Sequence, residues 1–157
     1  MYHAIVKRNL HRSFDALNRG QYDVVTRQFH KEATHWFSGE GHPLSGLRRG
    51  LPDILAWYDR LARLMPDLRF DIEQTAISGW PWDTVAMLSW RDALHDRAGK
   101  PFANRGVHVI RLRWGKVVDL QVYCDTSYLQ GHFDALVAQG VDEARAAPIQ
   151  TDHQQRV

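Results

Sequence analysis

Apolar residues recur at helical spacing in the first part of the chain. One helix is expected over residues 3–19, with Gly20 as its stop signal, and its buried positions are Val6, Leu10, Phe14 and Leu17. A second, shorter helix begins at Asp23, a residue type that caps helix N-termini. A third begins at Leu51 and ends before Pro66, with Ile54, Trp57, Leu61 and Leu64 facing inward.

Alternating apolar and polar residues predict strands through most of the remaining chain. A short strand is expected at residues 33–37, followed by a glycine-rich loop over residues 38–50. Further strands are expected at 68–73 and 84–91, with a loop over 92–101, then a hairpin over 102–124 and a helix from Thr126 to about Gly140. This order predicts an α+β fold with one antiparallel sheet and its helices on one side. A sheet that curves around a long helix forms a cone and leaves a cavity.

The hairpin over residues 102–124 places titratable side chains on one face. With Trp114-Gly115 as a two-residue turn, Ile110 pairs with Asp119 and His108 pairs with Gln121. Directly paired residues share a face, so one face carries Asn104, His108, Gln121, Tyr123 and Asp125. The other face carries Val107, Val109, Arg111, Val118, Leu120 and Val122. The first face is either the wall of a reactive pocket or the solvent side of an ordinary sheet.

Composition is that of a globular domain without an evident polyanionic partner. The 157 residues are 44% hydrophobic and 24% charged, and the formal net charge is +2 with no basic block. We therefore expect neither nucleic acid nor a membrane as partner. The single cysteine, Cys124, excludes an internal disulfide, and without a signal peptide or a spanning apolar run the expected location is cytoplasmic.

Three short motifs occur in an informative order. They are Ala16-Leu17-Asn18-Arg19-Gly20, His42-Pro43-Leu44-Ser45-Gly46, and the run from Gly115 through Asp119 to Tyr123-Cys124-Asp125-Thr126. Together they resemble the SnoaL-like polyketide cyclases of the nuclear transport factor 2 superfamily, over roughly residues 8–137. The resemblance implies a cone-shaped, strongly curved antiparallel sheet packed on a long N-terminal helix and two or three further helices. It also implies one domain over residues 1–140, a homodimer and no cofactor, and the polar segment 141–157 is expected to be poorly ordered.

The same resemblance assigns catalytic roles. An aspartate at the end of the last hairpin strand is the acid/base of the cyclases, and it falls on Asp125; a histidine on the preceding strand falls on His108. In the related ketosteroid isomerases, the tyrosine of the first helix and the aspartate after the first strand correspond to Ser13 and Phe37 here. Steroid isomerisation by that mechanism is therefore not expected.

Each candidate catalytic residue also has a structural interpretation. Burial would raise the pKa of Asp125 towards the strength of a general base, but Asp125 can equally cap the helix from Thr126. His108 can polarise a carbonyl or relay a proton, or it can be a structural hydrogen-bonding residue. Tyr123 can donate to a developing oxyanion, or simply pack its ring and expose its hydroxyl.

Aromatic and amide side chains complete the predicted site. Trp36, Trp57 and Trp90 are candidate pocket walls, although an aromatic residue at such spacing is more often core. Some of the six tryptophans are expected at the pocket and others at an interface. Adjacent strand residues point to opposite faces, so at most one of His35 and Trp36 lines the pocket, and Cys124 should point away from the face of Asp125. Asn104 and Gln121 are further candidates for contacting substrate.

These observations leave three hypotheses. The first is a cofactor-free cyclase, isomerase or hydratase that uses an aspartate base on a small hydrophobic or carbonyl-bearing molecule. The second is a module that binds such a ligand without turnover. The third is a structural dimerisation domain whose cavity is filled by side chains. Metal chemistry is not expected, because the nine histidines form no His-Glu-x-x-His and there are no paired cysteines.

Overall fold

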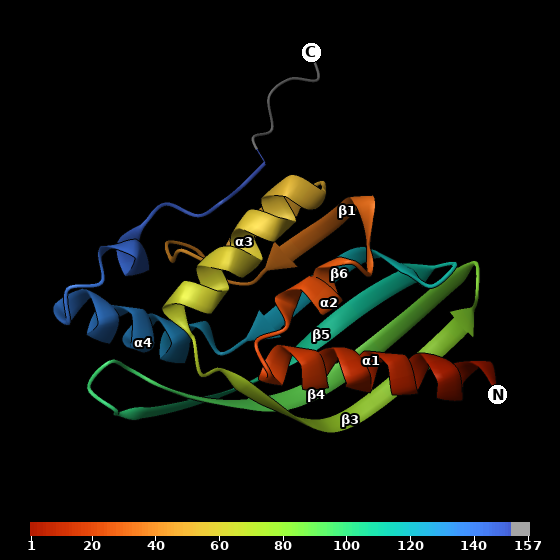
Figure 1. The fold of residues 1–157 in the computed structure, drawn as a ribbon, viewed down its shortest axis with the longest axis horizontal. Coiled ribbons are helices and arrows are strands. Elements are labelled where there is room, and N and C mark those ends of the chain that lie inside the picture. The colour runs from red at the N-terminus through yellow and green to blue at the C-terminus, as the bar shows by residue number, and fades with distance from the viewer. Residues whose placement is uncertain (152–157) are drawn as a thin grey trace, which may run out of the picture.

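The computed structural model describes residues 1–151 and consists of a curved six-stranded sheet with helices packed on one face (Figure 1). The helices are α1 (Tyr2–Asn18), α2 (Tyr22–Thr26), α3 (Leu51–Leu64) and α4 (Thr126–Ala138), followed by the 3-10 turn η1 (Asp142–Arg145). The strands are β1 (Phe29–Phe37), β2 (Gly46–Arg49), β3 (Arg69–Trp80), β4 (Asp83–His95), β5 (Pro101–Arg113) and β6 (Lys116–Cys124). The α+β architecture with a long N-terminal helix is confirmed.

The sheet has the order β2-β1-β6-β5-β4-β3, and β1 pairs with β6 in parallel. The sheet is therefore mixed, whereas the sequence predicted antiparallel pairing throughout. The segment 46–49 forms strand β2 on the edge next to β1, although its glycines predicted a loop. Gly46 adopts a φ of 91°, a conformation that glycine allows at the entry to this edge strand.

A β-bulge in β6 determines which side chains face the helices. Leu112 pairs with Val117 and Arg111 pairs with Asp119, so Val118 is an extra residue in β6. A bulge of this kind shifts the register by one residue and increases the local twist. His108 consequently pairs with Val122 rather than with Gln121, and the predicted register beyond the turn is wrong by one residue.

The core lies between the concave face of the sheet and the helices. Leu10, Phe14 and Leu17 of α1 and Trp57 and Leu61 of α3 are buried, as their helical spacing predicted. Inward-facing residues of the strands meet them and are also buried: Ala86, Leu88, Trp90, Ile110, Leu120 and Val122. Leu120 and Val122 thus belong to the core and not to the outer face on which the predicted register placed them.

Residues beyond α4 are held against the domain. Val141 and Ala144 are buried next to α4, so the apolar residues of this segment order its first part. Arg48 on β2 is also fully buried, and its guanidinium donates to the carbonyl oxygens of Ser45 (2.9 Å) and Ile149 (3.0 Å). The segment expected to be poorly ordered therefore packs on the sheet edge up to Thr151, and its remaining residues, 152–157, lie outside the described part.

We expect the substitution Arg48→Leu to lower the free energy of unfolding by about 2–3 kcal/mol, because several buried carbonyl groups would lose their donor. Chemical denaturation monitored by circular dichroism measures this change. Arg49→Leu, in the neighbouring exposed position, is the matched control and should change stability by less than about 0.5 kcal/mol. Equal effects of the two substitutions would show that the buried guanidinium does not anchor the C-terminal segment.

Candidate functional site

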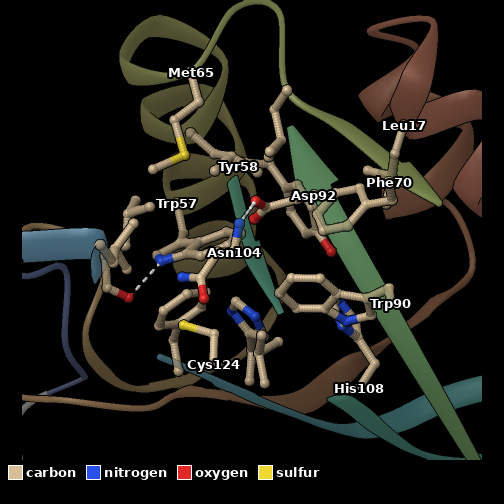
Figure 2. A pocket seen from close by; sticks show the side chains of 17 residues that line it. Leu17, Trp57, Tyr58, Met65, Phe70, Trp90, Asp92, Asn104, His108 and Cys124 are labelled. Carbon is tan, nitrogen blue, oxygen red and sulfur yellow. Dashed lines mark hydrogen bonds between the residues drawn. The ribbon is translucent and has the colours of Figure 1, made fainter. Parts of the chain in front are cut away.

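A pocket lies between the concave face of the sheet and α3 (Figure 2). Its walls are mainly apolar, and its polar lining residues are His35, Tyr58, Asp92, Asn104, His108 and Cys124. It contains about 530 Å³ of space between atoms, counting its open mouth, of which only about 40 Å³ can hold the centre of a water molecule. The pocket is therefore narrow, and a ligand must be slim or displace lining side chains.

A second, equally narrow chamber borders His108 and contains about 410 Å³ of space between atoms, counting its open mouth. Leu17, Tyr58 and His108 line both chambers, so these residues form the boundary between them. Apart from Ser13, Gln28, Tyr58 and His108 the second chamber is lined by apolar residues. The hydroxyl of Ser13 donates to the side-chain oxygen of Gln28 (2.9 Å), so these two polar groups satisfy one another.

His108 is held as a neutral imidazole with a defined tautomer. The indole N–H of Trp90 donates to Nδ1 of His108 at 2.7 Å. An indole nitrogen can only donate, so Nδ1 is the acceptor and the imidazole proton is on Nε2. Burial lowers the pKa of His108 to about 3, because a charged imidazolium would be poorly solvated among Phe14, Phe70 and Trp90. His108 therefore offers an Nε2–H donor near neutral pH.

Glycine at position 106 makes the contact between Trp90 and His108 possible. Trp90 pairs directly with Gly106 across β4 and β5. A Cβ atom at residue 106 would lie 2.4 Å from Cζ2 of Trp90 and 2.3 Å from the carbonyl oxygen of Tyr123. The bare backbone lets the indole lie flat across β5, two residues from His108.

His35 on β1 has a similar arrangement. Nε of Arg48 donates to Nδ1 of His35 (3.2 Å), which again leaves the imidazole proton on Nε2. This Nε2 atom is buried and has no hydrogen-bond partner within residues 1–151. Burial lowers the pKa of His35 well below its usual value, and the Arg48 charge lowers it further. The pocket wall thus contains two neutral imidazoles.

Asp92 is the acidic residue that lines the pocket. It follows Trp90 by two residues on β4, so both side chains face the helices. Burial raises the pKa of Asp92 to about 6, and a hydrogen bond from the backbone N–H of Asn104 (2.7 Å) acts in the opposite direction. A carboxyl group with this pKa is mostly ionised at pH 7 and is a stronger base than an ordinary aspartate.

The alternation of side chains along β4 could have identified Asp92, but the predicted strand was too short to include it. The predicted strand ended at Arg91, which assigned Asp92 to a loop. In the structure β4 continues to His95 and pairs residue by residue with β5, including Asp92 with Asn104. The alternation that places Trp90 inward therefore also places Asp92 inward.

Asp125, the aspartate favoured by sequence, is the N-cap of α4. Its carboxylate accepts hydrogen bonds from the backbone N–H groups of Ser127 and Tyr128, both at 3.1 Å. Asn104 holds this turn, because its side chain donates to the carbonyl of Asp125 (2.9 Å) and accepts from its N–H (3.2 Å). Asp125 lines an exposed depression next to the pocket, and Asp92 and Asn104 line both.

Tyr123, Gln121 and Trp36 do not line the pocket, because the bulge in β6 turns the first two to the outer face of the sheet. The ring of Tyr123 packs on Trp36 (5.0 Å between centroids), and its hydroxyl donates to Gln121 (2.8 Å). The other predicted residues, Trp57, Trp90, Asn104 and His108, do line it. The structure therefore does not bring Asp125, His108 and Tyr123 together. Cys124, expected to point elsewhere, faces the pocket, where burial raises its thiol pKa to about 11.

Metal ligands do not gather at this site. Within residues 1–151, no group of three or more histidine, cysteine, aspartate or glutamate side chains is arranged to hold a metal ion. The polar groups that line the pocket are instead suited to moving a proton and to donating hydrogen bonds.

Comparison with known proteins places this geometry in a family. A family model described as a SnoaL-like domain matches residues 10–120. A search of curated proteins gave no significant match. Among solved structures, PrhC from Penicillium brasilianum superposes with a TM-score of 0.72 at 10% identity, covering 87% of this chain and 91% of PrhC.

Two further structures share the fold. TerC, co-crystallized with polyporic acid, has a TM-score of 0.67 at 12% identity, over 79% of this chain and 94% of TerC. An NTF2-like protein from Burkholderia pseudomallei has a TM-score of 0.65 at 18% identity, over 78% and 92% of the two chains. At such identities these likenesses establish the nuclear transport factor 2-like fold, and the family match establishes membership: the chain belongs to the SnoaL-like domain family.

Proposed function

We propose that the chain binds a slim, largely apolar, carbonyl-bearing molecule and catalyses a cofactor-free proton transfer on it. The observation that carries this proposal is that Asp92, with its pKa near 6, and the neutral, donor-bearing His108 line the same apolar pocket. A base and a hydrogen-bond donor with displaced pKa values are typical of sites for enolisation chemistry. The pocket walls, Trp57 and Trp90 among them, suit a flat or elongated ligand.

The proposed reaction begins with removal of a proton from the carbon next to the substrate carbonyl. Ionised Asp92 takes the proton, and the negative charge moves to the carbonyl oxygen as an enolate. The Nε2–H of His108 donates to that oxygen and stabilises it without transferring its own proton. In an isomerisation, protonated Asp92 returns the proton to another carbon. In a cyclisation, the enolate carbon attacks a second carbonyl, and Asp92 protonates the new alkoxide.

This proposal gives the base role to Asp92 instead of Asp125. The carboxylate of Asp125 already accepts two backbone N–H groups at the start of α4, and it faces the outer depression. The alternative function, a binding module without turnover, uses the same pocket, and catalysis by Asp92 distinguishes the two.

We expect Asp92→Asn to reduce kcat/KM on an active carbonyl substrate by about 10²–10⁴-fold, because the isosteric amide cannot accept the proton. The dissociation constant of the substrate, measured by calorimetry, should change by less than about threefold, since asparagine has the same shape as aspartate. Asp125→Asn is the matched control and should change turnover by less than tenfold. Loss of activity in Asp125→Asn with retention in Asp92→Asn would return the base role to Asp125. Binding of carbonyl compounds by the wild-type protein without any turnover would favour the binding module.

The buried carboxyl of Asp92 should also make the free energy of unfolding depend on pH. A carboxyl whose pKa is raised on folding binds its proton more tightly in the folded state, so its ionisation costs no stability below about pH 4 and costs the full amount above about pH 6. Asp92→Asn should therefore stabilise the protein by about 1–3 kcal/mol at pH 7.5. Urea unfolding should show this gain shrinking towards zero as the pH falls to about 4.

Buried histidines also make the stability of both wild type and Asp92→Asn depend on pH in that experiment. Burial lowers the pKa values of four histidines, His35, His42, His108 and His132. Below about pH 6.5 the unfolded chain therefore binds more protons than the folded protein, and the free energy of unfolding decreases as the pH is lowered. This loss is common to wild type and variant and cancels in their difference. A difference between the two that is the same at pH 4 and pH 7.5 would contradict a raised pKa at Asp92.

We further propose that two copies of the chain associate through the outer face of the sheet. Met87 and Tyr123 are 49% and 44% exposed there, and Val107 and Val109 lie between them on β5. Exposed apolar patches of this kind commonly mark interfaces. Val109→Asp should convert a dimer into a monomer in sedimentation velocity, whereas Leu55→Asp on α3 should not. A wild-type protein that is monomeric at high micromolar concentration would contradict this proposal.

A further inference from the structure

Three of the six tryptophans gather at one end of the sheet, away from the pocket. Trp80 ends β3, Trp82 lies in the turn between β3 and β4, and Trp114 lies in the turn between β5 and β6. These side chains, which we call the tryptophan tip, are 63%, 56% and 74% exposed. Figure 1 shows both turns at the end of the sheet where the N-terminus lies. Trp57 and Trp90, by contrast, are each 3% exposed.

The tip is an organised surface. The rings of Trp80 and Trp82 are stacked, with centroids 6.0 Å apart and planes 10° apart, and Trp82 lies 6.4 Å from Trp114. The two turns are joined by a hydrogen bond from the N–H of Trp114 to the carbonyl of Pro81 (2.6 Å). Tyr2 and His3 of α1 also bind this end through Thr84 and Gly79. Hydrogen bonds between the two turns and to α1 therefore fix the backbone that carries the three indoles.

Folding alone does not account for tryptophan at position 114. Trp114 and Gly115 have φ values of 49° and 77°, which are those of a two-residue turn that favours Asn-Gly. A bulky side chain is disfavoured in this left-handed conformation. The indole nevertheless points to solvent and buries little surface, so a tryptophan at this position is better explained by contact with something outside the chain.

Positive charge flanks the tip. Arg113 and Lys116 bracket the Trp114 turn, and Arg12 lines an adjoining surface groove with Ile5 and Gly115. The nearby acid, Asp83, is already engaged by Arg111 through bonds of 2.6 and 2.7 Å. Within residues 1–151, no carboxylate lies within 4.0 Å of Arg12 or Lys116, and Arg113 reaches Asp83 only at 4.0 Å. Lys116 Nζ donates to the carbonyl oxygen of Arg27 (2.9 Å) and keeps its net positive charge. This end of the molecule thus combines exposed indoles with cations that have no close carboxylate partner.

We propose that the tryptophan tip docks the protein onto an anionic lipid surface. Indole rings favour the boundary between water and hydrocarbon, and flanking lysine and arginine side chains bind anionic headgroups. The three indoles expose about 400 Å² together, about half of what each partner contributes to a stable protein interface. No helix within residues 1–151 is long and apolar enough to cross a bilayer, so the association is peripheral. An apolar ligand for the pocket would be concentrated at such a surface.

The sequence predicted no membrane partner, because it contains neither a basic block nor a long apolar run. The tip differs from such a run: its three indoles are separated by up to 34 positions in sequence, and two adjacent hairpin turns bring them together. This proposal does not depend on catalysis and stands or falls separately from the function of the pocket.

Sedimentation of the full chain with vesicles tests the proposal. We expect it to partition onto vesicles of equal parts phosphatidylcholine and phosphatidylglycerol, more weakly at high salt. Trp114→Asn should reduce the partition coefficient about tenfold. The same substitution should leave the melting temperature unchanged or raised, since asparagine suits this turn. Leu55→Asn, an exposed apolar residue on α3, is the matched control and should not change partitioning.

Charge is tested separately. Arg113→Gln should reduce partitioning onto the anionic vesicles about fivefold and leave any partitioning onto pure phosphatidylcholine unchanged. No partitioning of the wild type, or equal partitioning of wild type and Trp114→Asn, would overturn the proposal. A change in self-association of Trp114→Asn in the absence of vesicles would overturn it in favour of a contact between copies.

Discussion

The site depends on which face of the sheet each residue of β6 occupies. The extra residue at Val118 turns Leu120, Val122 and Cys124 towards the helices, and turns Asp119, Gln121 and Tyr123 to the outside. A register without the bulge would place a glutamine and a tyrosine hydroxyl in the core and expose two apolar residues. The apolar pocket follows from this single residue, and so does the outer surface on which Tyr123 packs against Trp36.

The apolar surroundings then determine the charge state of the buried groups. His108 is neutral because its pKa is lowered, and the Trp90 indole decides which nitrogen carries its proton. The same burial raises the pKa of Asp92 and makes it a stronger base than a surface aspartate. One physical cause, poor solvation of charge, thus gives a hydrogen-bond donor and a base in one pocket. It also costs stability at neutral pH, as is common where a fold holds an ionisable group for chemistry.

The helices, the strand order along the chain and the α+β class could be predicted from sequence, because helical and alternating periodicities are local properties. Of the site residues that the sequence singled out, Trp57, Trp90, Asn104 and His108 line the pocket, and their roles there stay predictions. The bulge at Val118 was missed although the sequence marks it. Val117 stands at an odd position, whereas Leu120, Val122 and Cys124 stand at even positions, so the apolar alternation changes phase at Val117-Val118. Counting strict residue pairs from the two-residue turn passed over this change. Asp92 was missed because the strand was ended too early, and the tryptophan tip because it forms only when two turns meet. The fold can thus be predicted from sequence more completely than the site, because the site changes when the register of a strand shifts by one residue.

The most direct test of the central claim is the pKa of Asp92 in the unliganded protein, measured by carbon-13 NMR titration of the side-chain carboxyl, with Asp92→Asn to assign the signal. Burial of this carboxyl should place the titration midpoint at about 6. A midpoint near 4, the value of an ordinary solvated aspartate, would show that the pocket does not strengthen this carboxylate as a base, and it would remove Asp92 from the proposed chemistry.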